Sequence, residues 1–195
     1  MIVQIGEWII WEACRFLARQ HARGLMITVS INLSARQFTD QDLPGLIERI
    51  IKRTGASPAH LIFEITESML MGDTDAAINQ LNELKRLGLA FIYMTTLVQA
   101  IHTLSYLKRF PVDELKIDRS FVKDIPDDKN DMDITAAIIA MAQKMDLRVV
   151  AEGVETADQV DFLRNNACYL VQGYYFSMPL AEQELTRLNY SIISE

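Results

Sequence analysis

The sequence has few cysteines and no metal site built on them. Only two occur among the 195 residues, Cys14 and Cys168, far apart in the chain and without metal-ligand spacing. Cys14 lies in an apolar helical pattern, which indicates a buried free thiol rather than a reactive one. Free thiols are consistent with a reducing cytoplasm, where we expect the protein to act.

Clustered positive charge and long apolar runs are also absent. The formal net charge is −7, and the basic residues form no block. This argues against a polymeric nucleic acid or a membrane surface as partner, although metal ions could still hold an anionic ligand. No apolar run approaches the ~18 residues of a membrane span, and no signal-peptide pattern opens the chain. We therefore expect no membrane segment in this chain.

The length suits a single domain. Half of the residues are hydrophobic, and 195 residues are enough for one well-buried domain of about 150–200 residues. The chain is nevertheless short for a complete (β/α)₈ barrel, which typically needs ~250 residues. Because no linker or low-complexity stretch interrupts the sequence, we predict one domain over residues 1–195.

Strand-like and helix-like segments alternate along the chain with short links. The predicted strands are Ile27–Leu33, Leu61–Thr66, Leu89–Tyr93, Asp113–Ile117, Arg148–Ala151 and Tyr169–Phe176. The predicted helices are Val3–Arg19, Leu43–Arg53, Thr74–Leu87, a short one ending at Lys108, Asp131–Lys144, Ala157–Asn165 and Glu182–Leu188. Such alternation indicates parallel strands joined by crossover helices, and so an α/β fold.

Polar side chains recur at the carboxyl ends of the predicted strands. They are Asn32, Glu64, Lys116 with Asp118, Glu152 and Gln172. Each alone is ordinarily just a solvated polar side chain, but in a parallel barrel these ends meet on one rim, which is the working face. Oxygen donors without His or Cys suit a hard cation such as Mg²⁺ or Mn²⁺. A lysine among them could act as a base or stabilise an anionic transition state.

The segments that carry these residues resemble one known family. They are Ser30–Phe38 (SINLSARQF), Phe63–Glu67 (FEITE), Leu104–Val122 (LSYLKRFPVDELKIDRSFV), Val149–Glu155 (VVAEGVE) and Gln172–Tyr174 (QGY). In this order and spacing the sequence is similar to the EAL family, bacterial phosphodiesterases of cyclic di-GMP. The resemblance runs from about Val3 to Leu188. It implies an α/β fold, a modified (β/α)₈ barrel of the EAL type.

The resemblance also implies a mechanism and a role for each rim residue. Two metal ions, Mg²⁺ or Mn²⁺, would activate a water that attacks one phosphodiester of cyclic di-GMP and gives linear pGpG. The implied metal ligands are Asn32, Glu64 and Glu152, with Asp118 beside the metals. Lys116 would hold or deprotonate the water, and Glu155 would line the site. The implied supporting residues are Glu67, which would anchor the metal-binding loop, and Gln172.

The first departure from the family lies at the start of the chain. By resemblance, the opening strands, with the signature Glu-Ala-Leu and a substrate-binding Arg, fall upstream of Met1. We therefore expect an incomplete, N-terminally truncated barrel. Its unpaired strand edges would invite pairing with another chain, so we predict a homodimer or a protein partner.

The second departure is the family's metal-bridging loop, Asp-Asp-Phe-Gly-Thr-Gly-Tyr-Ser, which should precede Leu104. Residues 94–103 read MTTLVQAIHT, contain no carboxylate and are one residue longer than the family spacing. Without the bridging aspartates, a site does not easily hold two cations close together.

The replaced segment carries the family loop in another reading frame. One back-translation is ATG ACG ACT TTG GTA CAG GCT ATT CAT AC; read from its third base, it spells Asp-Asp-Phe-Gly-Thr-Gly-Tyr-Ser. We hypothesise a compensated pair of small insertions, whether in the gene or in its reading. The nucleotide sequence across Phe91–Leu104 tests this, because codons that do not spell the loop in another frame contradict it.

Three functions remain open from the sequence. The chain is a degenerate EAL domain that is inactive as written, a non-catalytic module that binds a nucleotide or a protein, or a fragment of a longer active phosphodiesterase. Loss of the ligands that hold the metals favours the first two, because the metals generate the nucleophile.

Overall fold

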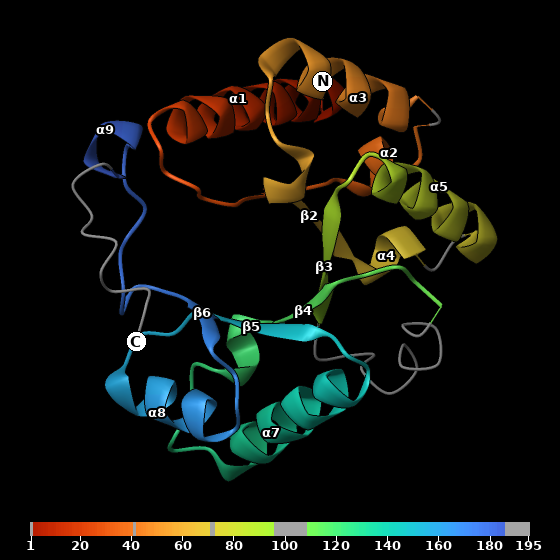
Figure 1. Ribbon diagram of the computed structural model, residues 1–195. Helices are drawn as coiled ribbons and strands as arrows, with labels where there is room; N and C mark the ends of the chain where they lie inside the picture. The colour runs from red at the N-terminus through yellow and green to blue at the C-terminus, as the bar shows by residue number, and fades with distance from the viewer. Residues whose placement is uncertain (1, 41, 71–72, 96–108, 186–195) are drawn as a thin grey trace.

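The sheet of this protein is parallel throughout. The computed structural model describes residues 2–40, 42–70, 73–95 and 109–185, and its six strands follow the chain in the order β1-β2-β3-β4-β5-β6. They are β1 Val29–Asn32, β2 Leu61–Thr66, β3 Ala90–Thr95, β4 Glu114–Ile117, β5 Arg148–Glu152 and β6 Leu170–Gln172. The sheet curls into a half-barrel (Figure 1), which confirms an α/β fold with an incomplete barrel.

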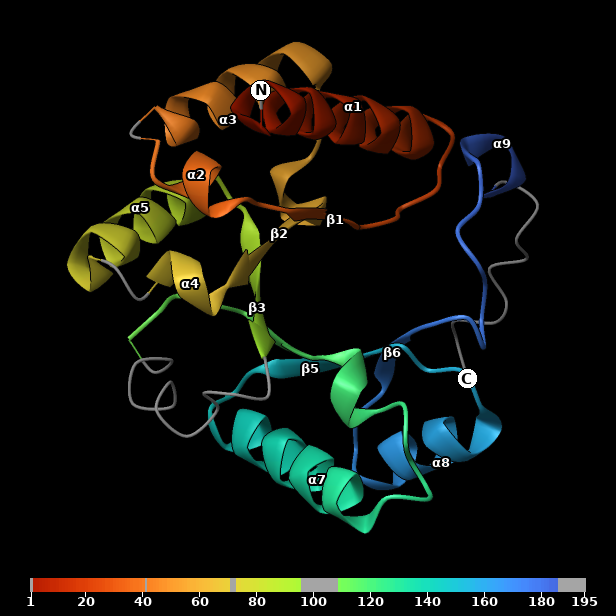
Figure 2. The same ribbon diagram turned by 180° about the vertical axis from the view of Figure 1, so that it is seen from behind.

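Helices cover the convex side of the curled sheet. The longer ones are α1 Ile2–Ala22, α3 Leu43–Thr54, α5 Thr74–Arg86, α7 Lys129–Lys144 and α8 Ala157–Asn165. The short ones are α2 Ala35–Phe38, α4 Glu67–Leu70 and α9 Glu182–Leu185, with 3₁₀ turns η1 Pro58–His60 and η2 Arg119–Phe121. Figures 1 and 2 show α1, α3 and α5 over the first half of the sheet and α7 and α8 over the second. No helix in the described ranges is long and apolar enough to cross a membrane.

The core lies between the sheet and these helices, because side chains alternate across each strand. On β2, Leu61, Phe63 and Ile65 belong to the hydrophobic core, and the Phe63 and Phe91 rings lie 6.4 Å apart. On β4, Leu115 and Ile117 join the same core. The alternate residues of these strands therefore face the concave side, and this places three charged residues inside the half-barrel, Glu64 on β2 and Glu114 and Lys116 on β4.

Helix α8 fixes the chain just beyond β5. Thr156 begins it with a capping box, in which its side chain accepts from the Gln159 backbone N–H and the Gln159 side chain accepts from the Thr156 backbone N–H. The Gln159 amide, 2 % exposed, also donates to the Val122 carbonyl at 3.1 Å. One buried side chain thus ties the loop after β5 to the turn after β4.

Both cysteines are buried free thiols, as predicted for Cys14. Burial raises the pKa of each thiol to about 11. Since the thiolate is the reactive form, both thiols are unreactive at neutral pH.

The last predicted strand is wrong in length. Strand β6 covers only Leu170–Gln172, because Gly173–Phe176 forms a turn in which the Tyr175 N–H donates to the Val154 carbonyl. Tyr174, Tyr175 and Phe176 are 58, 48 and 45 % exposed and so do not contribute to the core. The short helix predicted to end at Lys108 lies outside the described residues.

Candidate functional site

The candidate residues gather at the carboxyl ends of neighbouring strands. Asn32 at the end of β1 pairs in register with Glu64 on β2, and Glu152 at the end of β5 pairs with Gln172 on β6. Lys116 lies on β4, in register with Val150 of β5. Because all six strands are parallel, these positions share one rim, as the sequence predicts.

Three charged side chains meet at the centre of this rim, and we call Glu64, Lys116 and Glu152 the rim trio. The Lys116 Nζ donates to both carboxylate oxygens of Glu64 at 3.1 Å and lies 3.4 Å from Glu152 Oε2. The side chains of Glu64 and Lys116 are each 5 % exposed, whereas that of Glu152 is 35 % exposed. The buried part of the trio is therefore a closed ion pair, with Glu152 on its open side.

Asp118 and Glu155 lie in the rim loops and have local partners. The Asp118 carboxylate caps η2 by accepting the Ser120 backbone N–H at 2.9 Å. The Glu155 carboxylate forms an exposed ion pair with Arg119 at 2.6 Å. The Asp118 contact stabilises the turn after β4, and the Glu155–Arg119 pair joins that turn to the loop after β5.

The remaining predicted residues also lie at the rim. The Asn32 and Gln172 side chains are exposed, and the Gln172 carbonyl accepts from the backbone N–H groups of Gly153 and Val154. Glu67 is the first residue of α4, directly after β2. The structure therefore brings Glu64, Lys116 and Glu152 into contact and places the other predicted residues around them.

Sequence reasoning missed two residues that shape this site. Ser30 donates its hydroxyl to Glu64 Oε1 at 2.8 Å, and Arg119 holds Glu155. The period-two pattern of β1, which places Ser30 and Asn32 on one face, was the available signal for the first. For Arg119 there was none, because its partner lies far along the chain in another loop.

The rim does not fit a divalent metal site as it stands. Among the described residues, no three His, Cys, Asp or Glu side chains are grouped so that they could hold a metal ion. Both oxygens of Glu64 face an ammonium, and the Asp118 carboxylate faces a backbone N–H. The segment 96–103, which stands in place of the family's bridging loop, lies outside the described residues.

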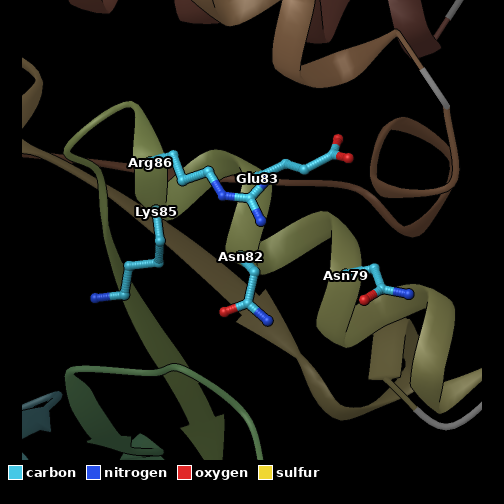
Figure 3. Close-up of a pocket in the computed structure, with 5 residues that line it drawn as sticks. All are labelled: Asn79, Asn82, Glu83, Lys85 and Arg86. Atoms are coloured by element: carbon cyan, nitrogen blue, oxygen red, sulfur yellow. The ribbon is translucent and has the colours of Figure 1, made fainter.

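A surface pocket lies on α5, away from the rim. It measures about 540 Å³ and is lined by Asn79, Asn82, Glu83, Lys85 and Arg86 (Figure 3). Its lining comes from one helix, and Lys85 points away from the two asparagines and forms an ion pair with Asp113. The side chains that line this open pocket do not point toward a common centre where a ligand could bind, so the rim remains the candidate site.

Comparison with known proteins identifies the family of this domain. A model of the EAL domain matches residues 1–179. The cyclic di-GMP phosphodiesterase NbdA of Pseudomonas aeruginosa is 42 % identical over 181 residues, which are 92 % of this chain and 23 % of that protein. The bifunctional diguanylate cyclase/cyclic di-GMP phosphodiesterase MucR of the same organism is 39 % identical over 189 residues, 95 % of this chain and 27 % of that protein. The chain thus spans about a quarter of these relatives.

Solved structures show the same fold. The Pseudomonas aeruginosa MucR phosphodiesterase in complex with c-di-GMP superposes with a TM-score of 0.88 at 38 % identity, over 94 % of this chain and 74 % of that chain. The EAL domain of Mycobacterium smegmatis DcpA gives 0.87 at 34 % identity, over 94 % of this chain and 82 % of that one. The curled parallel sheet, the charged rim and these matches lead to one conclusion: the chain belongs to the EAL domain family, whose members include metal-dependent cyclic di-GMP phosphodiesterases.

Proposed function

We propose that this EAL domain takes part in cyclic di-GMP signalling by binding the nucleotide without hydrolysing it. The observation that carries the proposal is the rim trio, in which the Lys116 ammonium lies 3.1 Å from Glu64 and 3.4 Å from Glu152. Metal catalysis of phosphodiester hydrolysis depends on cations that lower the pKa of a bound water and stabilise the attacking and leaving oxygens. The carboxylate-free segment 94–103 supplies no further ligand for such cations.

The rim residues are assigned as an inherited site. Asn32, Glu64, Glu152 and Asp118 correspond to the family's metal-binding positions, Lys116 and Glu155 to its catalytic ones, and Glu67 and Gln172 to its supports. In this chain we propose that the rim does not retain two Mg²⁺ or Mn²⁺ ions. Support comes from the contacts of Glu64 and Asp118, whose oxygens face Lys116 and the Ser120 N–H.

Cyclic di-GMP is the proposed ligand because the MucR phosphodiesterase, a close structural relative, was solved in complex with it. We further propose that residues 1–195 form one domain, and that the domain acts in the cytoplasm, which its buried free thiols support.

Titration calorimetry tests nucleotide binding and its dependence on metal. We expect cyclic di-GMP to bind with the same affinity in EDTA and in excess Mg²⁺, because the rim supplies its own cation. Affinity that rises tenfold or more on addition of Mg²⁺ would contradict a metal-free mode. If no binding heat is detected in either buffer, cyclic di-GMP is not the ligand of this domain, and a protein partner becomes the proposed ligand.

A second candidate function is self-association through the open sheet. Strands β1 and β6 end the order of the described strands, so each has one edge without a strand beside it in that sheet. Because all strands are parallel, β6 of one chain can continue into β1 of another with the same polarity. Helix α1 exposes Ile2, Ile5 and Trp8 at 50, 46 and 62 %. We therefore propose a second copy of this chain as partner, which sedimentation velocity over a range of concentrations measures.

A further inference from the structure

The rim trio holds two carboxylates close to one ammonium group in a mostly buried place. Glu64 is 4 % exposed as a residue, and Lys116 likewise. A buried carboxylate without a partner is costly, and two that share a site disfavour each other's charge. Something positively charged must therefore lie between Glu64 and Glu152 if both are to remain ionised in the folded domain.

Lys116 fulfils that requirement geometrically. Its Nζ reaches both oxygens of Glu64 at 3.1 Å and one oxygen of Glu152 at 3.4 Å. Ser30 completes the set from β1 by donating to the Glu64 oxygen Oε1 at 2.8 Å. The ammonium is held by strand β4, whose four residues are all buried, so its position is fixed by the sheet rather than by a loop.

We infer that Lys116 is a built-in cation, which takes the place of a divalent metal ion by pairing with Glu64 and Glu152. The stability of the folded rim therefore does not depend on divalent metal ions. The inference deepens the proposed function and rests on it. A divalent cation that entered between the same carboxylates would meet the ammonium at close range, and like charges repel strongly where water is excluded. Such a metal binds only if Lys116 moves out or is removed.

Thermal unfolding of the chain, without nucleotide, tests this. The melting temperature of the unaltered protein is expected to be the same in EDTA and in millimolar Mn²⁺. Lys116→Met removes the charge but keeps an apolar stem of similar length, so Glu64 loses its buried partner. The melting temperature in EDTA should then fall by roughly 10 °C. Mn²⁺ should restore roughly 5 °C or more of that loss by binding the two carboxylates that have lost their ammonium partner.

Two further variants separate a built-in cation from a merely packed side chain. Lys116→Arg keeps the charge, and its melting temperature should stay insensitive to Mn²⁺. Lys116→Met combined with Glu152→Gln removes one carboxylate, and the recovery with Mn²⁺ should disappear. If Lys116→Met folds only in Mn²⁺, the inference is supported, and Lys116→Arg then serves as the folded comparison in EDTA.

The opposite results overturn the inference. If Mn²⁺ raised the melting temperature of the unaltered protein by several degrees, the rim would bind a metal ion despite Lys116. If the Lys116→Met protein had the melting temperature of the unaltered protein, and Mn²⁺ did not change it, the ammonium would make no stabilising contact with the two carboxylates. Neither result involves nucleotide, so failure here is distinguishable from a failure of the proposed function, which nucleotide binding and turnover report.

Discussion

Replacing Phe63 by alanine is expected to lower the free energy of unfolding by about 3–5 kcal/mol. Phe63 is completely buried in the middle of β2, with its ring 6.4 Å from that of Phe91. Strands β1 and β3 hydrogen-bond to both sides of β2, so the backbone cannot move inward to fill the space that the ring leaves. The cost therefore includes the cavity as well as the lost burial. Urea denaturation measures it.

Tyr169→Ala provides a matched aromatic control. Tyr169 is 74 % exposed, and its truncation should change the free energy of unfolding by no more than about 0.5 kcal/mol. If Phe63→Ala were as mild as this control, the core between the sheet and the helices would not be packed as described.

Gly173→Ala should destabilise the domain by roughly 3 kcal/mol, at the upper end of overpacking costs. A Cβ at Gly173 would lie 2.0 Å from the carbonyl oxygen and 2.3 Å from the nitrogen of Val154. Both atoms belong to the backbone, which accordingly must shift. The shift would pull on the contacts of Gln172 with Gly153 and Val154, which join β6 to the loop beyond β5. The same denaturation experiment measures the loss.

Gly45→Ala is the corresponding control with the opposite sign. Gly45 lies in α3, and a Cβ there would lie 2.7 Å from Asp42 Oδ1 and 3.4 Å from Arg49 Nη1, which are ends of exposed side chains that can move aside, not backbone atoms. Alanine is favoured over glycine within a helix by about 1 kcal/mol, so this variant should be slightly more stable. Equal effects at Gly45 and Gly173 would show that the close approach of β6 to Val154 is not real.

Much of the fold could be predicted from the sequence, because the periodicity of its apolar residues and the positions of its turn and capping residues indicate the same helices and strands. The bounds of β2 and α8 match the predicted Leu61–Thr66 and Ala157–Asn165, where clear apolar patterns are bounded by turn or capping residues. The rim also followed from the pattern, since polar residues that close successive parallel strands must share one edge of the sheet. Glu64, Lys116 and Glu152 meet for that reason.

The sequence could not show which rim side chains pair. Glu64 and Lys116 are separated by β3, and their contact depends on how far the sheet curls, which no local pattern encodes. The family resemblance implies that Lys116 holds or deprotonates a water, and it does not predict the contact of the ammonium with both oxygens of Glu64. The turn after β6 was mistaken for strand because Tyr174, Tyr175 and Phe176 have strand-like side chains, although Gly173 ends the pairing.

Hydrolysis of cyclic di-GMP in excess Mn²⁺ tests the central claim most directly. Chromatography should detect no pGpG above the background of the buffer, because we propose that Lys116, in contact with Glu64 and Glu152, prevents the rim from retaining the cations that would generate the nucleophile. Formation of pGpG that Lys116→Ala abolishes would contradict the account. It would show that this rim still assembles a working site.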